Sequence, residues 1–210
     1  MIYESSGWKN ELYKSFRDLC KFRQLSRPSE LSFIKAEKSI LFAAYIMRKL
    51  NEAEKIPPDF FDQSLLVTKY DGTADLIDRV NWHKFSDNYN LSKPVDCEIK
   101  TSYLVNQLIH SFTFVLSFDE RNKFDGILVN SDKSKQNSLY FISAANILTQ
   151  ILKISEGEMM HSQRCRSYDV TSDTYGPMKL VSANYVYPNG FDIEKIVMAS
   201  LNGSIYARNR

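Results

Sequence analysis

A long run of helical periodicity, bounded by prolines at both ends, is the feature that most constrains the fold of this chain. The run extends from Pro28 to about Lys55, and Pro57-Pro58 ends it because proline cannot continue a helix. It predicts a helix about 40 Å long. Its apolar stripe is wide enough that at least two other elements are expected to pack on it. The stripe consists of Leu31, Ile34, Ile40, Leu41, Ala44, Tyr45, Met47 and Leu50.

A second amphipathic pattern precedes this run. Between Trp8 and Leu25, Leu12, Phe16 and Leu19 recur at helical spacing, and most of the basic residues fall on other faces. The chain breaks at 26–30, where we expect Pro28 in the first turn of the second helix, with Ser26 or Arg27 just before it. The two patterns together predict an N-terminal helical hairpin.

The clearest strand signal is the alternation of Phe112, Phe114, Leu116 and Phe118 with smaller side chains. Side chains on a strand point alternately to its two faces, so this segment presents an aromatic face to a core. Two further runs, 124–129 and 139–142, follow after polar turns. The three predict an antiparallel meander, and residues 143–154 have the period of a helix that packs across it.

Weaker patterns complete the chain. We expect a polar, exposed insert at 71–94 and an irregular, polar segment at 156–176. The other expected elements are strands at 64–70, 95–100 and 178–187 and helices at 101–110 and 191–201.

These elements predict an α+β fold, with a long N-terminal helical hairpin packed on a small antiparallel meander sheet that carries C-terminal helices. A chain of 210 residues has the length of a single domain. Within it we expect a helical lobe at about 1–56 and a mixed α/β lobe at about 64–201.

Composition indicates a cytoplasmic globular protein. With 43% hydrophobic residues the chain can bury a core, and it contains neither a secretory leader pattern nor an apolar run long enough to cross a membrane. Cys20, Cys97 and Cys165 are far apart and odd in number, which is typical of buried cysteines in a reducing compartment rather than of a disulfide framework. We expect no membrane partner.

Several site classes lack sequence support. The seven glycines form neither a dinucleotide-binding nor a P-loop motif. His161 and Cys165 have a possible ligand spacing, but no second pair completes a zinc site, so we expect no metal and no cofactor. His110 is placed where a helix ends, which favours a structural cap over a catalytic base.

One short run resembles PD-(D/E)xK nucleases. In these enzymes a Glu-x-Lys on a strand follows an upstream aspartate, the carboxylates hold Mg²⁺, and the lysine positions the attacking water. Here Glu98 and Lys100 have the required spacing. The resemblance implies Asp75 or Asp78 as the upstream carboxylate and Gln107 as a supporting polar group. Its structural alternative is an ordinary charge pair on a strand edge.

The order of residues around Asn106–His110 is similar to that of HEPN-type RNases. Those enzymes have four to six residues between an arginine and the histidine. Arg79 and His83 have only three residues between them, and no other histidine of this chain has an arginine at the required spacing. The missing arginine removes most of the support for an RNase of this type.

Charge is distributed unevenly along the chain. Residues 1–56 carry 11 basic and 7 acidic side chains, and residues 57–130 carry 7 and 11. Arg17, Lys21 and Lys38 could therefore belong to a nucleic-acid-binding face across the two N-terminal helices. The alternative is a solvated helix face, because the neighbouring aromatic residues have core spacing.

No complete catalytic set is present, so the sequence favours a non-catalytic interaction or assembly subunit that binds a protein partner, with a nucleic-acid-processing complex as one setting for it. Two alternatives stay open. They are a metal-dependent nuclease using Asp78, Glu98, Lys100 and Gln107 with Mg²⁺, and a nucleic-acid-binding module without catalysis.

Overall fold

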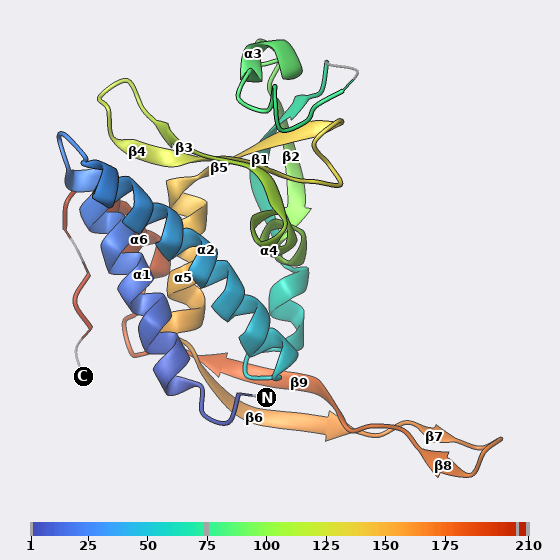
Figure 1. The fold of residues 1–210 in the computed structure, drawn as a ribbon. Coiled ribbons are helices and arrows are strands. Elements are labelled where there is room, and N and C mark those ends of the chain that lie inside the picture. Colours follow the sequence, from blue (N-terminus) through green and yellow to red (C-terminus); the bar gives the residue numbers. More distant parts are fainter. Residues whose placement is uncertain (1, 74–75, 205, 209–210) are drawn as a thin grey trace.

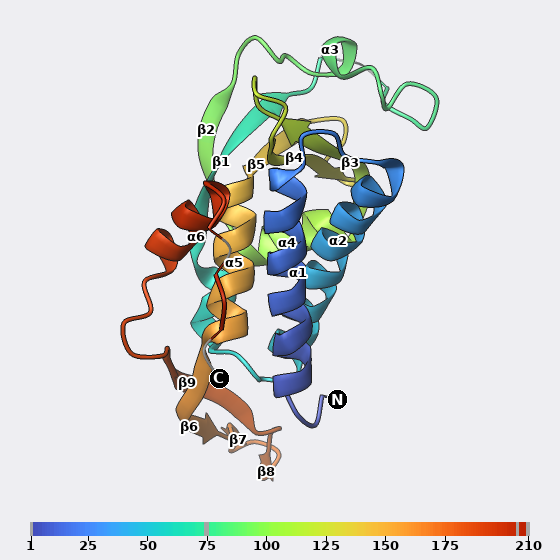
Figure 2. The same ribbon diagram turned by 90° about the vertical axis from the view of Figure 1, so that its left-hand side faces the viewer.

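The computed structural model describes residues 2–73, 76–204 and 206–208. An antiparallel sheet lies across one end of a layer of helices, and a two-stranded ribbon leaves the opposite end (Figure 1). This architecture confirms the predicted α+β fold. The helices stand side by side in the order α6 (Ile193–Leu201), α5 (Ala144–Glu156), α1 (Ser6–Gln24) and α2 (Glu30–Glu52), as Figure 2 shows.

The predicted helical hairpin is present, with a different start for its second helix. Helix α2 begins at Glu30, and Pro28 lies outside it. Ser29 explains the difference, because its hydroxyl accepts a hydrogen bond from the backbone N–H of Ser32 at 3.3 Å and so caps the helix. The helix ends at Glu52, which makes it about 35 Å long.

The sheet has five strands in the order β2-β1-β5-β4-β3, and all neighbours are antiparallel. The predicted meander forms one side of this sheet, in which Leu128 lies opposite Val115 on one neighbour and Phe141 on the other. The strands are β1 (Ser64–Asp71), β2 (Val95–Lys100), β3 (Ser111–Phe118), β4 (Phe124–Ser131) and β5 (Ser138–Ser143). A short 3-10 helix, η1 (Pro58–Asp62), leads into β1.

One apolar cluster joins the helices to the sheet. It contains Phe16 of α1, Ile40 of α2, Ile127 of β4 and Ile151 of α5, all essentially inaccessible to solvent. The expected helix across the meander is α5, capped by Ser143, whose hydroxyl accepts from the N–H of Asn146 at 3.2 Å. Helix α4 (Thr101–Ile109) follows β2 and packs between α2 and β4.

The segment between β1 and β2 differs from the expected exposed insert. It contains a short helix, α3 (Phe85–Asn88), and its residues Ile77, Asn88 and Tyr89 are buried. The Tyr89 hydroxyl donates to the Lys135 carbonyl at 2.8 Å and accepts from the Asn130 amide at 2.6 Å. Most other described side chains of the segment are exposed. Tyr89 therefore anchors a segment whose other described side chains are mostly exposed.

The segment expected to be irregular, 156–176, instead contains a strand that pairs with the strand expected at 178–187 to form a ribbon. Strands β6 (Glu158–Cys165) and β9 (Lys179–Val186) pair with each other and with no other described strand, and the ribbon extends away from the helices (Figure 1). Two short strands, β7 (Tyr168–Asp169) and β8 (Thr174–Tyr175), close its tip. Nearly all residues of β6 are exposed, and its sequence lacks the alternation that identifies a half-buried strand.

Candidate functional site

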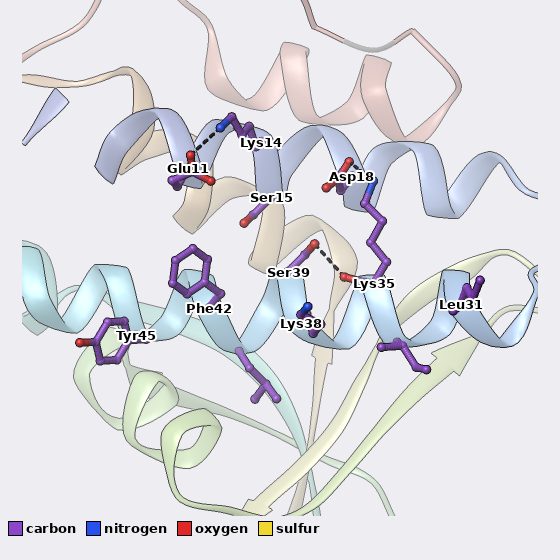
Figure 3. Close-up of a pocket in the computed structure, with 12 residues that line it drawn as sticks. Glu11, Lys14, Ser15, Asp18, Leu31, Lys35, Lys38, Ser39, Phe42 and Tyr45 are labelled. Atoms are coloured by element: carbon purple, nitrogen blue, oxygen red, sulfur yellow. Dashed lines mark hydrogen bonds and ion pairs between the residues drawn. The ribbon is translucent and has the colours of Figure 1, made fainter. Parts of the chain in front are cut away.

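A groove of about 680 Å³ runs between α1 and α2, and Figure 3 shows its lining. Ser15 of α1 and Ser39 of α2 lie between the two helices and are buried, so the floor is built from small side chains. The Ser39 hydroxyl is satisfied within its own helix, since it donates to the Lys35 carbonyl at 2.8 Å. The apolar part of the lining comes from α2, whereas α1 contributes the charged side chains Glu11, Lys14 and Asp18.

The apolar wall is a stripe of side chains that α2 turns towards solvent. Their exposed fractions are large for apolar residues: Leu31 78%, Ile34 43%, Leu41 37%, Phe42 43% and Tyr45 43%. The rings of Phe42 and Tyr45 stack with centroids 6.4 Å apart. We call Leu31, Ile34, Lys38, Leu41, Phe42 and Tyr45 the outer stripe of α2. The other side of the same helix is buried in the core.

The spacing of the outer stripe is that of a helix-packing seam. Leu31, Ile34, Lys38, Leu41 and Tyr45 follow one another in alternating steps of three and four residues. Side chains at this spacing form a seam along one side of a helix, and such seams pack against another helix. Residues of α1 line the groove beside this seam.

Charged pairs cross or line the rim of the groove. Lys35 reaches Asp18 of α1 at 2.9 Å, and Lys14 reaches Glu11 at 2.5 Å (Figure 3). Lys38, which is exposed in the middle of the outer stripe, has no ion-pair partner among the described residues. The groove therefore combines an apolar wall with one unpaired cation.

Arg17 lies apart from Lys21 and Lys38, the other two basic residues proposed for nucleic acid. Lys21 lines a smaller hollow between α1 and α2 that also includes Lys35, and Lys38 lines the main groove. Arg17 points to another side of α1, where its guanidinium lies 6.0 Å from the ring centre of Tyr13. A strip of basic residues continuous across both helices is thus not formed by these three.

The residues of the nuclease alternative lie in three places. Glu98 and Lys100 are exposed on the edge strand β2, where Lys100 pairs with Asp62 at 2.8 Å. Gln107 is buried, and its carbonyl oxygen accepts from the Ser131 N–H at 2.6 Å and from the Ser134 hydroxyl at 2.8 Å. This bonding gives Gln107 a structural role in holding the turn after β4.

The upstream carboxylate of that alternative is also engaged locally. Asp78 accepts from the backbone N–H groups of Val80 at 2.7 Å and Asn81 at 3.2 Å, which makes it a turn residue in the segment between β1 and β2. Asp75 lies outside the described residues. Across 2–73, 76–204 and 206–208, no three His, Cys, Asp or Glu side chains are grouped so that they could hold a metal ion.

A second hollow, of about 700 Å³, lies where α4 meets the turn after β4. His110 contributes to it and is the residue at which α4 ends, as expected for a cap. The Tyr103 and Tyr140 hydroxyls are 3.2 Å apart beside it. Burial, followed by the hydrogen bond with Tyr140, raises the pKa of Tyr103 to about 12. The charged side chains in its lining include Arg48, Asp132 and Lys133.

The cysteines occupy three different environments. Cys20 is buried on α1, and burial raises its pKa to about 12. Cys97 is half-buried and Cys165 is exposed. The expectation that all three are small buried residues is therefore wrong for Cys165, because it stands on the ribbon rather than in the core.

The sequence pattern predicted one wide apolar stripe on α2. It did not distinguish the exposed outer stripe from the side of the helix that is buried in the core. The signal that distinguishes it was present as the three-four spacing through Leu31, Lys38 and Tyr45. Lys38 in the middle of this seam indicates which side of the helix stays near solvent, because lysine is rarely buried without a partner.

The chain matches no protein-family model, no curated protein and no solved structure. None of the helices among the described residues combines the length and apolarity needed to cross a bilayer.

Proposed function

We propose that this protein is a non-catalytic interaction subunit that binds a protein partner through the groove between α1 and α2. The observation that carries the proposal is the outer stripe of α2, in which five large apolar side chains are exposed along one helix. Scattered exposed apolar residues are normal on a protein surface. A contiguous apolar patch rimmed by polar groups is typical of an interaction site.

The shape and chemistry of the groove favour a protein over a small ligand or a nucleic acid. Its wall is aliphatic and aromatic, and two of its lysines, Lys14 and Lys35, are already paired with carboxylates. Nucleic-acid surfaces need several cations free to contact phosphates. The groove has an apolar wall and a floor of small residues. Such a surface is suited to binding the apolar face of a polypeptide.

The test is to purify the full chain from its native host and to compare it with two variants. Leu41→Asp places a charge on the outer stripe, and Leu91→Asp is the control, because Leu91 is exposed to a similar degree, 40% against 37%, in a loop far along the chain. We expect a stoichiometric protein partner that Leu41→Asp loses and Leu91→Asp keeps. A partner retained equally by both variants would contradict the proposal.

The same preparations distinguish the two alternatives. Cleavage of DNA or RNA that requires Mg²⁺ or Mn²⁺ and disappears in Glu98→Ala and Lys100→Ala would establish the nuclease instead. Nucleic-acid binding without cleavage that weakens steeply with salt, and with replacement of Lys21 or Lys38, would establish the binding module. Either result, with no protein partner, replaces the proposed function.

A further inference from the structure

The position of Lys38 limits what can cover the outer stripe. Lys38 lies midway along the stripe, seven residues after Leu31 and seven before Tyr45. It is exposed, and within the described ranges it has no ion-pair partner. Any partner that packs along the whole stripe therefore removes this ammonium group partly from water. Such a partner must offer it a negative charge, because burial of an unpaired cation is costly.

A second copy of this chain does not meet that requirement. In a symmetric parallel pairing of two α2 helices, each residue faces its own copy. In an antiparallel pairing centred on the stripe, the middle residue faces its own copy. Both arrangements bring two Lys38 ammonium groups together at the seam, and like charges at a seam disfavour the pairing.

The shape of the surface indicates a helix as the occupant. The three-four spacing of the stripe matches the seam that one helix presents to another. Ser15 and Ser39 on the floor are small and buried, which allows a close approach. From Leu31 to Tyr45 the stripe is about 21 Å long, which corresponds to about four helical turns in the partner.

We propose that the groove binds an amphipathic helix of a different protein that carries an Asp or Glu in the middle of its apolar face, opposite Lys38. This inference rests on the proposed function and specifies its partner. The aliphatic residues of that helix cover Leu31, Ile34 and Leu41, and its carboxylate pairs with Lys38. The carboxylate is central, so the pairing is the same whichever way the helix runs.

A display library of amphipathic helices tests the proposal on the full chain. The peptides are about 18 residues long, with varied apolar residues on one face and Glu, Asp, Lys, Arg, Gln or Leu at its central position. Binders are selected with the wild-type chain and counted only where Leu41→Asp abolishes binding. Circular dichroism and thermal melting confirm that both variants used in the test, Leu41→Asp and Lys38→Glu, stay folded.

We expect Asp and Glu to exceed Lys and Arg at the central position by about tenfold with the wild-type chain. We expect Lys38→Glu to reverse this preference. Groove-dependent binders with no charge preference would overturn the inference and leave the proposed function standing. If no binder depends on Leu41, the proposed function itself fails.

The oligomeric state of the chain alone is the second readout. Sedimentation at increasing concentration should show no dimer that depends on the outer stripe. A dimer that Leu41→Asp dissociates would overturn the inference, because a second copy would then be the occupant.

Discussion

The two sides of α2 carry similar apolar residues, but one side is buried and the other is exposed. On the inner side Ile40, Ala44 and Met47 are buried on the helix whose neighbours are α1, α4 and α5, and on the outer side Leu31, Ile34 and Leu41 stay exposed. Apolar composition therefore does not determine burial. The number of neighbouring elements does, and on the outer side of this helix the described chain leaves an apolar seam largely uncovered.

The largest difference between the two sides is expected in stability. Ile40→Ala should lower the free energy of unfolding by about 2–5 kcal/mol, because it removes fully buried atoms and leaves a cavity in the core. Urea unfolding monitored by circular dichroism measures the change. A loss below about 0.5 kcal/mol would mean that the inner side is not packed as described.

Two residues of the nuclease alternative offer a similar contrast, because Gln107 is buried and Glu98 is exposed. Gln107→Ala should cost about 1–2 kcal/mol, because the buried Ser131 N–H loses its shorter acceptor and keeps only the Ser134 hydroxyl at 3.1 Å. Glu98→Ala should stay within about 0.5 kcal/mol of wild type. Equal losses in both unfolding curves would contradict the structural role of Gln107.

Cys20 extends the comparison to pH. Its pKa is about 12 in the fold against the ordinary 9.0, so above pH 9 the unfolded chain releases the thiol proton while the folded chain keeps it. The unfolded state then binds fewer protons, and stability falls as pH rises. This thiol should contribute a loss of about 1 kcal/mol between pH 9 and pH 10.

Unfolding curves at the two pH values measure the contribution of Cys20. Cys20→Ala should show a smaller loss than wild type over this interval. Cys165→Ala, which removes an exposed thiol, is the matched control and should keep the wild-type loss. If both variants lose stability alike, burial of Cys20 does not affect the pH dependence.

The smallest expected effect is on the outer side of α2. Leu31→Ala should change the free energy of unfolding by less than about 0.5 kcal/mol, because Leu31 is 78% exposed and alanine favours a helix. Chemical unfolding of the isolated chain measures it. A loss as large as that of Ile40→Ala would show that something in the chain covers the stripe.

Local pattern was sufficient where apolar residues recur at the period of the element. The meander was predictable because Phe114 and Leu116 belong to an alternating run, and the helical hairpin because Leu12, Phe16 and Leu19 repeat at the period of a helix. Strand β9 was expected at 178–187, but its partner β6 was missed because nearly all of its residues are exposed and its sequence does not alternate. Tyr89 was missed because its hydroxyl partners, Asn130 and Lys135, are far away in sequence.

By itself, the sequence determined the α+β class, the order of the main elements and a seam of residues from Leu31 to Tyr45 on one helix. Only the tertiary structure decided which side of that helix remains open and which of its lysines has no ion-pair partner among the described residues. The physical reason is that periodicity is a property of one element, whereas burial and charge pairing depend on which distant elements pack beside it.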